Sequence, residues 1–385
     1  MERKTYRITL KVDGELEQRF RGTAGCRRMV YNLGLELEKE AIAELGHRLG
    51  YTIVASFLPF WKEKYPFLKD VPSQCLQQAL RDLEVAFKRF YQGVSKFPVF
   101  KKFRGKASFR FPDGVVIENR RIWLPKFGYV GFFKSEEIEG KIKSVTVVRD
   151  VDRWKAKILT ERPDTVKPVR ARTEVGADLG VKKLATLSDG TVVPSVSPDA
   201  AIVCKLKAAQ RTLSKKEKGS NNFEKQRILL GRINRKIRDT REDKLHKATT
   251  GMAKDFSHIV LEDLNTKEMM QSASRSLNRS IGEQAWGKFI GYLKYKAARL
   301  GGIVIFVNPA GTSQTCHRCR VRDRKSRISQ AVFSCVACGW TGDADYNAAC
   351  NILAAGHAVF CGGTCELESR RSRDQEKPVR VSLEV

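Results

Sequence analysis

Two Cys-x-x-Cys pairs constrain the fold of this chain more tightly than any other feature. Cys316 and Cys319 form the first pair, Cys335 and Cys338 form the second, and 15 residues separate the pairs. Each pair offers two thiolates, and four thiolates at this spacing complete the closed tetrahedral shell of one structural zinc ion. Free or redox-active thiols are the alternative. We expect a zinc ribbon, in which His317 is not a ligand because the four cysteines already fill the shell.

The charge balance indicates a polyanionic partner. Among 385 residues, Lys and Arg number 72 against 43 Asp and Glu, which gives a formal net charge of +29 at pH 7. Self-repulsion of this size works against a compact state, and solubility requires a net charge of only about 2–8 in a small domain. Nucleic acid is therefore the favoured partner, and a merely solubilising surface is the alternative.

The composition also limits the class of protein and its compartment. Hydrophobic residues make up 42% of the chain, which excludes wholesale disorder. The chain has no stretch of 18 apolar residues, and its N-terminus lacks the apolar segment of a secretory signal, so we expect no membrane partner. Cysteines at metal-ligand spacing fit a reducing cytosol better than a disulfide scaffold. The expected location is the cytoplasm.

Hydrophobic periodicity divides the chain into two halves at Pro163 and Pro168. In the first half, strands at 5–12 and across 97–164 flank a helix at 23–48 and a second helix that begins after Pro72, with Ser73 as its N-cap. We interpret this half as a β-barrel interrupted by a helical insert. The second half predicts strands at 174–179, 183–187, 191–194, 257–262 and 303–307, a helical hairpin over 199–254, and helices at 282–300 and 345–355.

Three acidic residues lie where apolar segments begin or end. Asp178 and Glu262 lie near the ends of predicted strands, and Asp345 opens a predicted helix. A buried carboxylate without a partner is costly, so such positions call for an explanation. Three carboxylates that converge from separate elements can hold two divalent ions about 4 Å apart, an arrangement that clamps the attacking and leaving oxygens in phosphodiester hydrolysis. Mg²⁺ suits such an all-oxygen site.

Each carboxylate also has a purely structural explanation. Asp345 could cap its helix, Asp178 could be a turn residue before Gly180, and Glu262 could be a surface charge beside Asp263. The excess of basic residues favours the nuclease interpretation over these three alternatives.

Basic residues gather in three segments outside these motifs. The segment Phe97–Phe111 carries Lys and Arg but no acid, and several Phe side chains are interleaved with them. The hairpin at 199–254 and the loop between the two cysteine pairs are basic as well. Lys and Arg neutralise phosphates, whereas the Phe rings either belong to the core or stack on bases. A solvated helix face is the alternative for the hairpin.

The remaining cysteines are not expected to bind metal. Cys26, Cys75, Cys204 and Cys350 fall on apolar helical faces and are predicted to be small core residues. No role is assigned to Cys361 and Cys365.

Longer stretches of the sequence resemble a known family. Four segments resemble the split RuvC motifs and the embedded zinc ribbon of TnpB proteins. They are GADLGVKKLATLSDG, HIVLEDLN, VNPAGTSQTCHRC and CGWTGDADYNAACNIL. Three further segments resemble the N-terminal half of TnpB sequences, namely CRRMVYNLGLELEKE, VPSQCLQQALRDLEVAFKRFY and SFRF. TnpB proteins are RNA-guided DNA nucleases of insertion sequences and relatives of type V CRISPR effectors. The resemblance covers about residues 5–355. It has two departures: Arg320 stands where the family often has Gly, and the loop from there to Cys335 is unusually basic.

The resemblance implies an α+β multidomain fold. Its parts would be a wedge-type β-barrel split over 1–23 and 96–165, a helical recognition insert at 24–95, an RNase H-like (RuvC) α/β domain split over 170–311 and 342–357, a zinc ribbon at 312–341, and a disordered tail at 358–385.

The resemblance also implies roles for individual residues. Asp178, Glu262 and Asp345 take the catalytic positions and would hold two Mg²⁺ or Mn²⁺ ions, and the four paired cysteines take the zinc positions. The implied partners are a guide RNA from the element's end and double-stranded target DNA that carries a short adjacent motif, and a monomer is favoured. Amides and Arg side chains can reach base edges. We therefore expect nucleic-acid contacts from Ser73, Gln74, Gln77, Gln78, Arg81, Lys101, Lys102 and Arg104.

Three other functions remain as alternatives. The chain could be a miniature type V CRISPR effector, or an RNA-guided repressor that binds DNA without cutting it. A transposase that joins strands is disfavoured, because nothing in the sequence supplies a separate nucleophile for strand transfer.

Overall fold

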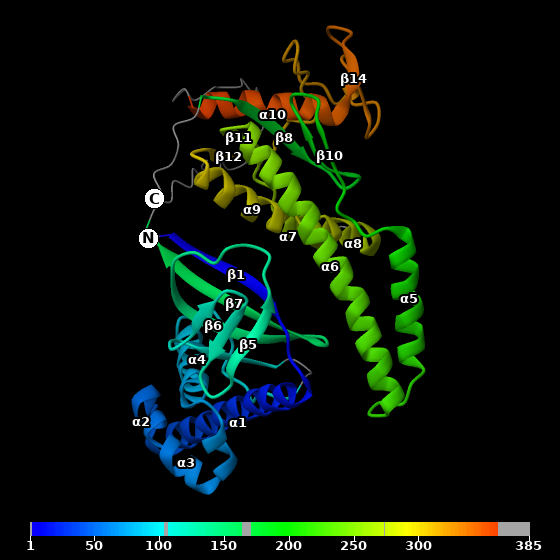
Figure 1. The fold of residues 1–385 in the computed structure, drawn as a ribbon. Helices are drawn as coiled ribbons and strands as arrows, with labels where there is room; N and C mark the ends of the chain where they lie inside the picture. The colour runs from blue at the N-terminus through cyan, green and yellow to red at the C-terminus, as the bar shows by residue number, and fades with distance from the viewer. Residues whose placement is uncertain (1, 104–106, 164–170, 273, 361–385) are drawn as a thin grey trace. The chain divides into compact units, whose positions relative to one another are not determined.

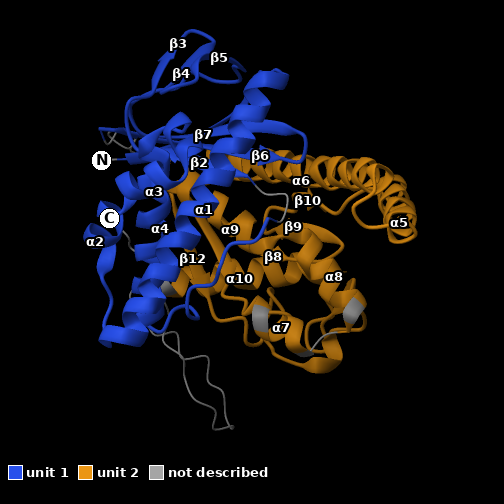
Figure 2. Cartoon of the chain, turned by 90° about the horizontal axis from the view of Figure 1, so that it is seen from below, with its two compact units in different colours: residues 1–165 blue, residues 166–385 orange. Residues whose placement is uncertain are grey.

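The computed structural model describes residues 2–103, 107–163, 171–272 and 274–360 (Figure 1). Two compact units make up the chain, unit 1 up to residue 165 and unit 2 from residue 166, which Figure 2 shows in different colours. Arg104, Cys361, Cys365 and the tail from residue 361 onward lie outside the described residues. Among the helices within the described ranges, none combines the length and apolarity that a membrane crossing requires.

Unit 1 contains a seven-stranded antiparallel sheet in the order β2-β6-β7-β1-β5-β4-β3. The predicted β-barrel is present as a half-barrel, whose edge strands in the described residues are β2 and β3. The sheet bends because β1 pairs with β7 over most of its length but with β5 only through Thr9 and Leu10. The strands are β1 (Glu2–Leu10), β2 (Ser108–Phe111), β3 (Val116–Glu118), β4 (Arg121–Leu124), β5 (Gly128–Phe133), β6 (Lys141–Asp150) and β7 (Arg153–Arg162).

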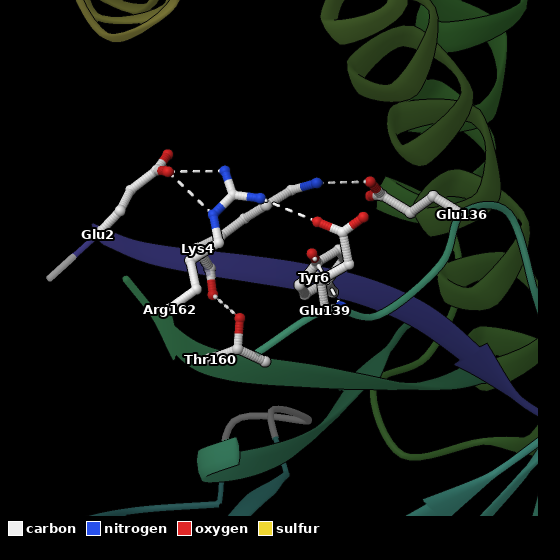
Figure 3. Close-up of polar contacts among 7 residues, drawn as sticks. All are labelled: Glu2, Lys4, Tyr6, Glu136, Glu139, Thr160 and Arg162. Carbon is white, nitrogen blue, oxygen red and sulfur yellow. Dashed lines mark hydrogen bonds and ion pairs between the residues drawn. The ribbon is translucent and has the colours of Figure 1, made fainter. Parts of the chain in front are cut away.

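An ion-pair network joins β1 and β7, the first and last strands of this sheet in chain order (Figure 3). The nearly buried guanidinium of Arg162 on β7 donates to Glu2 on β1 at 2.7 Å and to Glu139 at 3.0 Å. Lys4 pairs with Glu136 at 2.7 Å in the same region. These contacts hold β1 against β7. Since β1 precedes the helical segment and β7 follows it, both belong to one sheet from which the helices are an insertion.

The helical insert packs on this sheet through a shared hydrophobic core. Its helices are α1 (Gly14–Leu45), α2 (Gly50–Ser56), α3 (Leu58–Lys64) and α4 (Ser73–Tyr91). The first helix begins earlier than predicted, because the Asp13 carboxylate accepts a hydrogen bond from the Leu16 N–H and caps it. The predicted N-cap role of Ser73 is wrong: Pro72 occupies the cap position, and Ser73 Oγ instead accepts from Lys62 Nζ at 2.8 Å.

Unit 2 contains a five-stranded mixed sheet in the order β10-β9-β8-β11-β12, in which β8, β11 and β12 are parallel. Its strands lie where the sequence predicts them, within one residue. They are β8 (Glu174–Leu179), β9 (Lys183–Leu187), β10 (Val192–Pro194), β11 (His258–Glu262) and β12 (Ile303–Val307). A small hairpin of β13 (Val332–Ser334) and β14 (Thr341–Asp343) belongs to the cysteine-rich segment.

Helices cover both faces of this sheet. Ile259 and Leu261 of β11 pack with the core under α6 and α9, whereas Val260 between them packs against Ile352 of α10. Burial on both faces explains why the strand is a continuous apolar run rather than an alternating one. The helices are α5 (Ala200–Ser214), α6 (Asn221–Asp255), α7 (Thr266–Ser272), α8 (Arg275–Gln284), α9 (Trp286–Arg299) and α10 (Ala344–Phe360).

Two helical boundaries in unit 2 differ from the predictions. The single helix expected at 282–300 is two helices, which meet at Ala285 with a φ of 53°. Helix α10 runs to Phe360 and so enters the segment predicted as a tail from residue 358.

Helix α10 lies unusually close to β8. A Cβ placed on Gly176 would be 2.2 Å from the Ala349 carbonyl oxygen and 2.6 Å from the Leu353 nitrogen. Only glycine permits this approach of two backbones. The contact fixes the helix that carries Asp345 against the strand that carries Asp178.

Candidate active site and metal centre

The parallel pairing of β8 and β11 brings two of the predicted carboxylates together. Leu261 pairs with Ala177, so the next residues along the two strands, Glu262 and Asp178, share one end of the sheet. Asp178 lies within the ladder to β9, where it pairs with Thr186. It is therefore a strand residue, and its explanation as a turn residue fails.

Glu262 is a buried carboxylate with a defined donor. Its side chain is only 8% exposed, whereas the neighbouring Asp263 is exposed and fits the role of a surface charge. The hydroxyl of Thr312 donates to Glu262 Oε1 at 2.5 Å. Burial raises the pKa of Glu262, and the hydrogen bond from Thr312 opposes that rise.

Asp178 is the point at which the three carboxylates interact. Burial and, after it, the negative charges of Glu262 and Asp345 together raise its pKa to about 7. Arg327, from the loop between the cysteine pairs, lowers the pKa of Asp178 and that of Asp345, so its positive charge lies within electrostatic reach of both.

Asp345 does not cap its helix. Asp343 Oδ1 accepts from the backbone N–H groups of Asp345 at 2.8 Å and Tyr346 at 3.1 Å, so Asp343 performs the capping. Lys183 Nζ is 3.1 Å from Asp343 Oδ2 and 3.8 Å from Asp345 Oδ2. Burial and the charge of Asp343 raise the pKa of Asp345. The capping explanation for Asp345 therefore fails.

These residues form a partly buried cluster of mutually repelling carboxylates. Oxygen-only donors with excess negative charge fit a hard divalent cation such as Mg²⁺, which would relieve the repulsion. Within the described residues, however, the four cysteines are the set of possible metal ligands whose donor atoms lie within 4.8 Å of one another.

The four predicted cysteines form a compact metal centre. Cys316 Sγ lies 3.7 Å from Cys338 Sγ, and Cys319 Sγ lies 3.5 Å from Cys335 Sγ. A tetrahedral zinc ion with Zn–S bonds of about 2.3 Å requires S···S separations of about 3.8 Å, so the sulfur positions fit zinc. The backbone N–H of Cys338 is the main cause of a lowered Cys335 pKa, about 6, which favours the thiolate that a metal needs.

The two cysteine pairs have the same backbone geometry although their sequences differ. Gly339, after Cys338, has a φ of 72°, and Arg320, after Cys319, has a φ of 63°. A left-handed Arg costs about 1–2 kcal/mol, so the departure from Gly is a strained one. The Arg320 guanidinium donates to Asn351 Oδ1 on α10 at 3.2 Å, a contact that Gly cannot make.

Two buried amides on α10, which the sequence analysis did not single out, attach the cysteine-rich segment to the sheet. Asn347 Nδ2 donates to the Thr315 carbonyl at 2.8 Å, and its Oδ1 accepts from the His317 N–H at 2.9 Å. Asn351 Nδ2 donates to the carbonyls of Thr312 and Thr315. Their spacing of four residues, which places both on one helix face, was the signal in the sequence.

Most other unassigned cysteines have the predicted environment. Cys26 and Cys75 are buried and Cys350 is half-buried. The prediction for Cys204 is wrong, because this residue is exposed on α5, a helix that buries only Ala209.

The predicted nucleic-acid residues of unit 1 lie on accessible surface. Ser73, Gln77 and Arg81 are exposed on α4, opposite its buried stripe, and Gln74 and Gln78 are half-buried beside them. Lys102 is exposed, whereas Lys101 stacks its ammonium over Tyr31 at 4.2 Å and Asn32 holds its backbone. Phe109 and Phe111 belong to the core, whereas Phe100 and Phe103 are exposed.

Three family models match separate ranges of the chain. Residues 1–47, 157–273 and 286–352 match family models described as "Helix-turn-helix domain", "Probable transposase" and "Cas12f1-like, TNB domain". In the structure the first of these ranges holds a strand and one continuous helix rather than two helices and a turn.

The most similar proteins share both length and sequence. The chain is 40% identical over 390 residues to "Putative RNA-guided DNA endonuclease InsQ" of Escherichia coli strain K12, covering 97% of each. It is 33% identical over 369 residues to a protein of Streptomyces pristinaespiralis with the same description, covering 93% of this chain and 90% of that one.

One solved structure supports the fold. A Cas12f1 chain, solved in complex with guide RNA and target DNA, matches 88% of this chain and 83% of its own length with a TM-score of 0.52 and 15% identity. From its motifs, its matched family models and its near full-length identity to curated relatives, the chain belongs to the TnpB family of RNA-guided DNA endonucleases.

Proposed function

We propose that this protein is an RNA-guided endonuclease that hydrolyses phosphodiester bonds of double-stranded DNA at Asp178, Glu262 and Asp345. The observation that carries the proposal is the raised pKa of Asp178, which burial and the charges of the other two carboxylates produce together. Perturbation by like charges in a site exposed to solvent on one side is typical of catalytic carboxylates. The net charge of +29 suits a protein that holds nucleic acid by its phosphates.

The chain's own residues would position the reacting groups. Asp178, Glu262 and Asp345 would hold two Mg²⁺ ions, which when bound activate a water and stabilise the charge on the scissile phosphate. Thr312 orients Glu262 through its hydrogen bond, and Asp343 leaves Asp345 available by capping α10 in its place. Arg327 and Lys183 supply positive charge close to the carboxylates, where they can meet the phosphate oxygens of DNA.

Base pairing between a guide RNA and one DNA strand would supply the sequence specificity. The exposed face of α4, with Gln77 and Arg81, is our proposed reader of a short adjacent motif, and the half-barrel with its helical insert would form the wedge and recognition parts. The RNase H-like domain would comprise unit 2 outside the zinc ribbon, and the working form would be a monomer.

The proposal is tested by measuring cleavage of the target DNA and binding of the same DNA side by side. Asp178→Ala should abolish cleavage of a DNA target that pairs with the copurified RNA, while target binding by the same complex is retained. Asp263→Ala is the matched control, since it removes an exposed carboxylate next to Glu262 and should cut normally. Cleavage by Asp178→Ala at the native rate would refute the site. Absence of any abundant copurifying RNA would contradict guidance.

The second candidate function is RNA-guided binding without cleavage. It would be favoured only if the native protein bound its target with Mg²⁺ present and left both strands intact.

A further inference from the structure

A cleft in unit 2 lies apart from the carboxylates and the cysteines. It has a volume of about 390 Å³ and is enclosed by α5, α6, α8 and the segment before α5. On α5 its lining residues follow a spacing of three and four, from Val203 through Leu206 to Gln210, and α6 repeats this spacing from Asn234 through Ile237 to Arg241. In a fully packed hairpin these stripes would bury each other.

A hydrogen bond joins the two helices of the hairpin beside the cleft. There the Gln226 amide donates to the Ala209 carbonyl at 3.1 Å, and Ala209 is the buried residue of α5. Leu206 and Ile237, nearer the sheet, are only partly buried, so the space between their helices is left for a ligand.

One wall of the cleft is held rigidly. The buried Gln284 of α8 donates through Nε2 to the Val181 carbonyl at 2.5 Å and to Ser195 Oγ at 2.8 Å, and its Oε1 accepts from the Val196 N–H. These bonds fix the segment that leads to Pro198, which lines the cleft. A preorganised wall lowers the entropy cost of binding.

The lining combines two kinds of chemistry. Leu206 and Ile237 provide aliphatic walls. Positive charge comes from Lys207, Arg238, Arg241 and Arg279, against the single carboxylate of Glu283 in the lining. In the described part of the chain, the buried Nε of Arg241 has no hydrogen-bond partner, which is costly for a guanidinium nitrogen. An acceptor with negative charge would satisfy it.

We propose that this cleft binds one unpaired nucleotide of a single-stranded nucleic acid. The base lies between Leu206 and Ile237, its phosphate meets Arg241 and Lys207, and the amide of Gln210 reaches the base edge. The volume lies at the lower end of the range of about 300–1,000 Å³ for small-ligand sites, so it admits one nucleotide and no duplex. A bare anion would not need aliphatic walls, and an apolar ligand would not need the four cations of the lining.

The nature of the partner rests on the proposed function, since a guided nuclease handles single strands of RNA and of displaced DNA. Both strands share the chemistry of base, sugar and phosphate. The test therefore uses RNA and DNA probes of one sequence.

The experiment fills the cleft without changing the charge. Ile237→Trp places an indole in the cleft, and Leu229→Trp makes the same change on α6 at an exposed position outside it. Fluorescence anisotropy then measures the binding of labelled RNA and DNA strands, longer than a site of about 4–16 nucleotides, to the full-length protein in EDTA. Circular dichroism verifies that both variants are folded.

We expect Ile237→Trp to weaken binding about tenfold for the RNA or the DNA strand, in the range of one stacked base, and Leu229→Trp to bind as the native protein does. Abasic sites placed one at a time along the more tightly bound probe should weaken binding to the native protein at one position. An abasic site at that position should have no effect on binding to Ile237→Trp. Arg241→Ala should lower the salt slope by about 0.7, and Lys236→Ala, outside the cleft, should not.

Equal affinities of Ile237→Trp and Leu229→Trp for both strands would overturn the proposal, as would abasic effects spread evenly along the probe. If Ile237→Trp is unfolded, Arg241→Ala and the abasic series decide alone. Asp178→Asn is included to separate the two proposals: if it cuts DNA while the cleft variants behave as expected, the active site is wrong and the cleft stands.

Discussion

Replacing Asp178 by Asn should stabilise the metal-free protein at neutral and alkaline pH. Burial together with the charges of Glu262 and Asp345 raises the pKa of Asp178 to about 7 from its ordinary value of 3.8. A group whose folded pKa is raised above its unfolded value favours the folded state at low pH and loses that advantage as pH rises toward the folded pKa. Asn carries no charge at any pH and avoids this loss.

The size of the effect follows from the two pKa values. Their difference corresponds to about 4 kcal/mol of unfolding free energy above pH 7, and to about 2 kcal/mol at pH 5.5, where Asp178 is still protonated in the folded state. For a unit of this size, about 4 kcal/mol corresponds to a rise of about 10 °C in Tm. Below pH 4 the variant and the native protein should have the same stability.

Thermal unfolding in EDTA at pH 4, 5.5 and 8.5 measures this difference. Asp263→Asn is the control, because it neutralises an exposed carboxylate next to Glu262 and should show no pH-dependent gain. With Mg²⁺ at pH 8.5 the order should reverse, since the ion stabilises the native site and not the variant. A variant that is equally or less stable than the native protein at every pH would refute the claim that these carboxylates repel one another across a buried site.

Three further predictions concern the supports of the site. Gly176→Ala should destabilise unit 2 by about 1–3 kcal/mol or more in denaturant unfolding, because its Cβ would meet the backbone of α10 at 2.2 Å, whereas Gly282→Ala, with open space around it, should not. Thr312→Val should weaken Mg²⁺ activation of cleavage about 10–100-fold by removing the hydrogen bond to Glu262, and Thr312→Ser should restore it; equal activation of both variants would contradict this. Cys335→Ser should reduce bound zinc from one ion per chain to substoichiometric amounts. It should also lower cleavage with Mg²⁺ in excess, because the segment that carries Thr312 and Arg327 is no longer held by the zinc ion. Full zinc content of the variant, measured by mass spectrometry, would count against the four-thiolate centre.

Several elements and the clustering of the four paired cysteines could be predicted from the sequence because local chemistry determines them. Cysteine spacing alone selects a zinc ribbon, and the apolar runs at β8, β11 and β12 predict buried strands to within one residue. Turn residues mark the hairpin of α5 and α6. The errors also have local causes. The Asp13 carboxylate caps α1 well before the predicted start at residue 23, and Lys62 Nζ donates to the Ser73 hydroxyl that was predicted to cap α4.

The tertiary structure decided what each carboxylate does. The sequence left Asp178, Glu262 and Asp345 with a structural alternative each. Those alternatives failed only when β8 was seen to pair with β9, when Asp263 was found exposed, and when Asp343 was found to cap α10. Hydrogen bonds between residues far apart in the chain, such as Thr312 to Glu262, leave no periodic signal in a sequence.

What the sequence alone determined is therefore the inventory of chemistry: four thiolates, three acids and a large excess of positive charge. What only the fold decided is which of these groups share one low-dielectric environment. The pKa of Asp178 rises because parallel strands and a helix packed over a glycine bring charges from three distant segments to one end of a sheet, and electrostatic energy depends on distance in space rather than on separation along the chain.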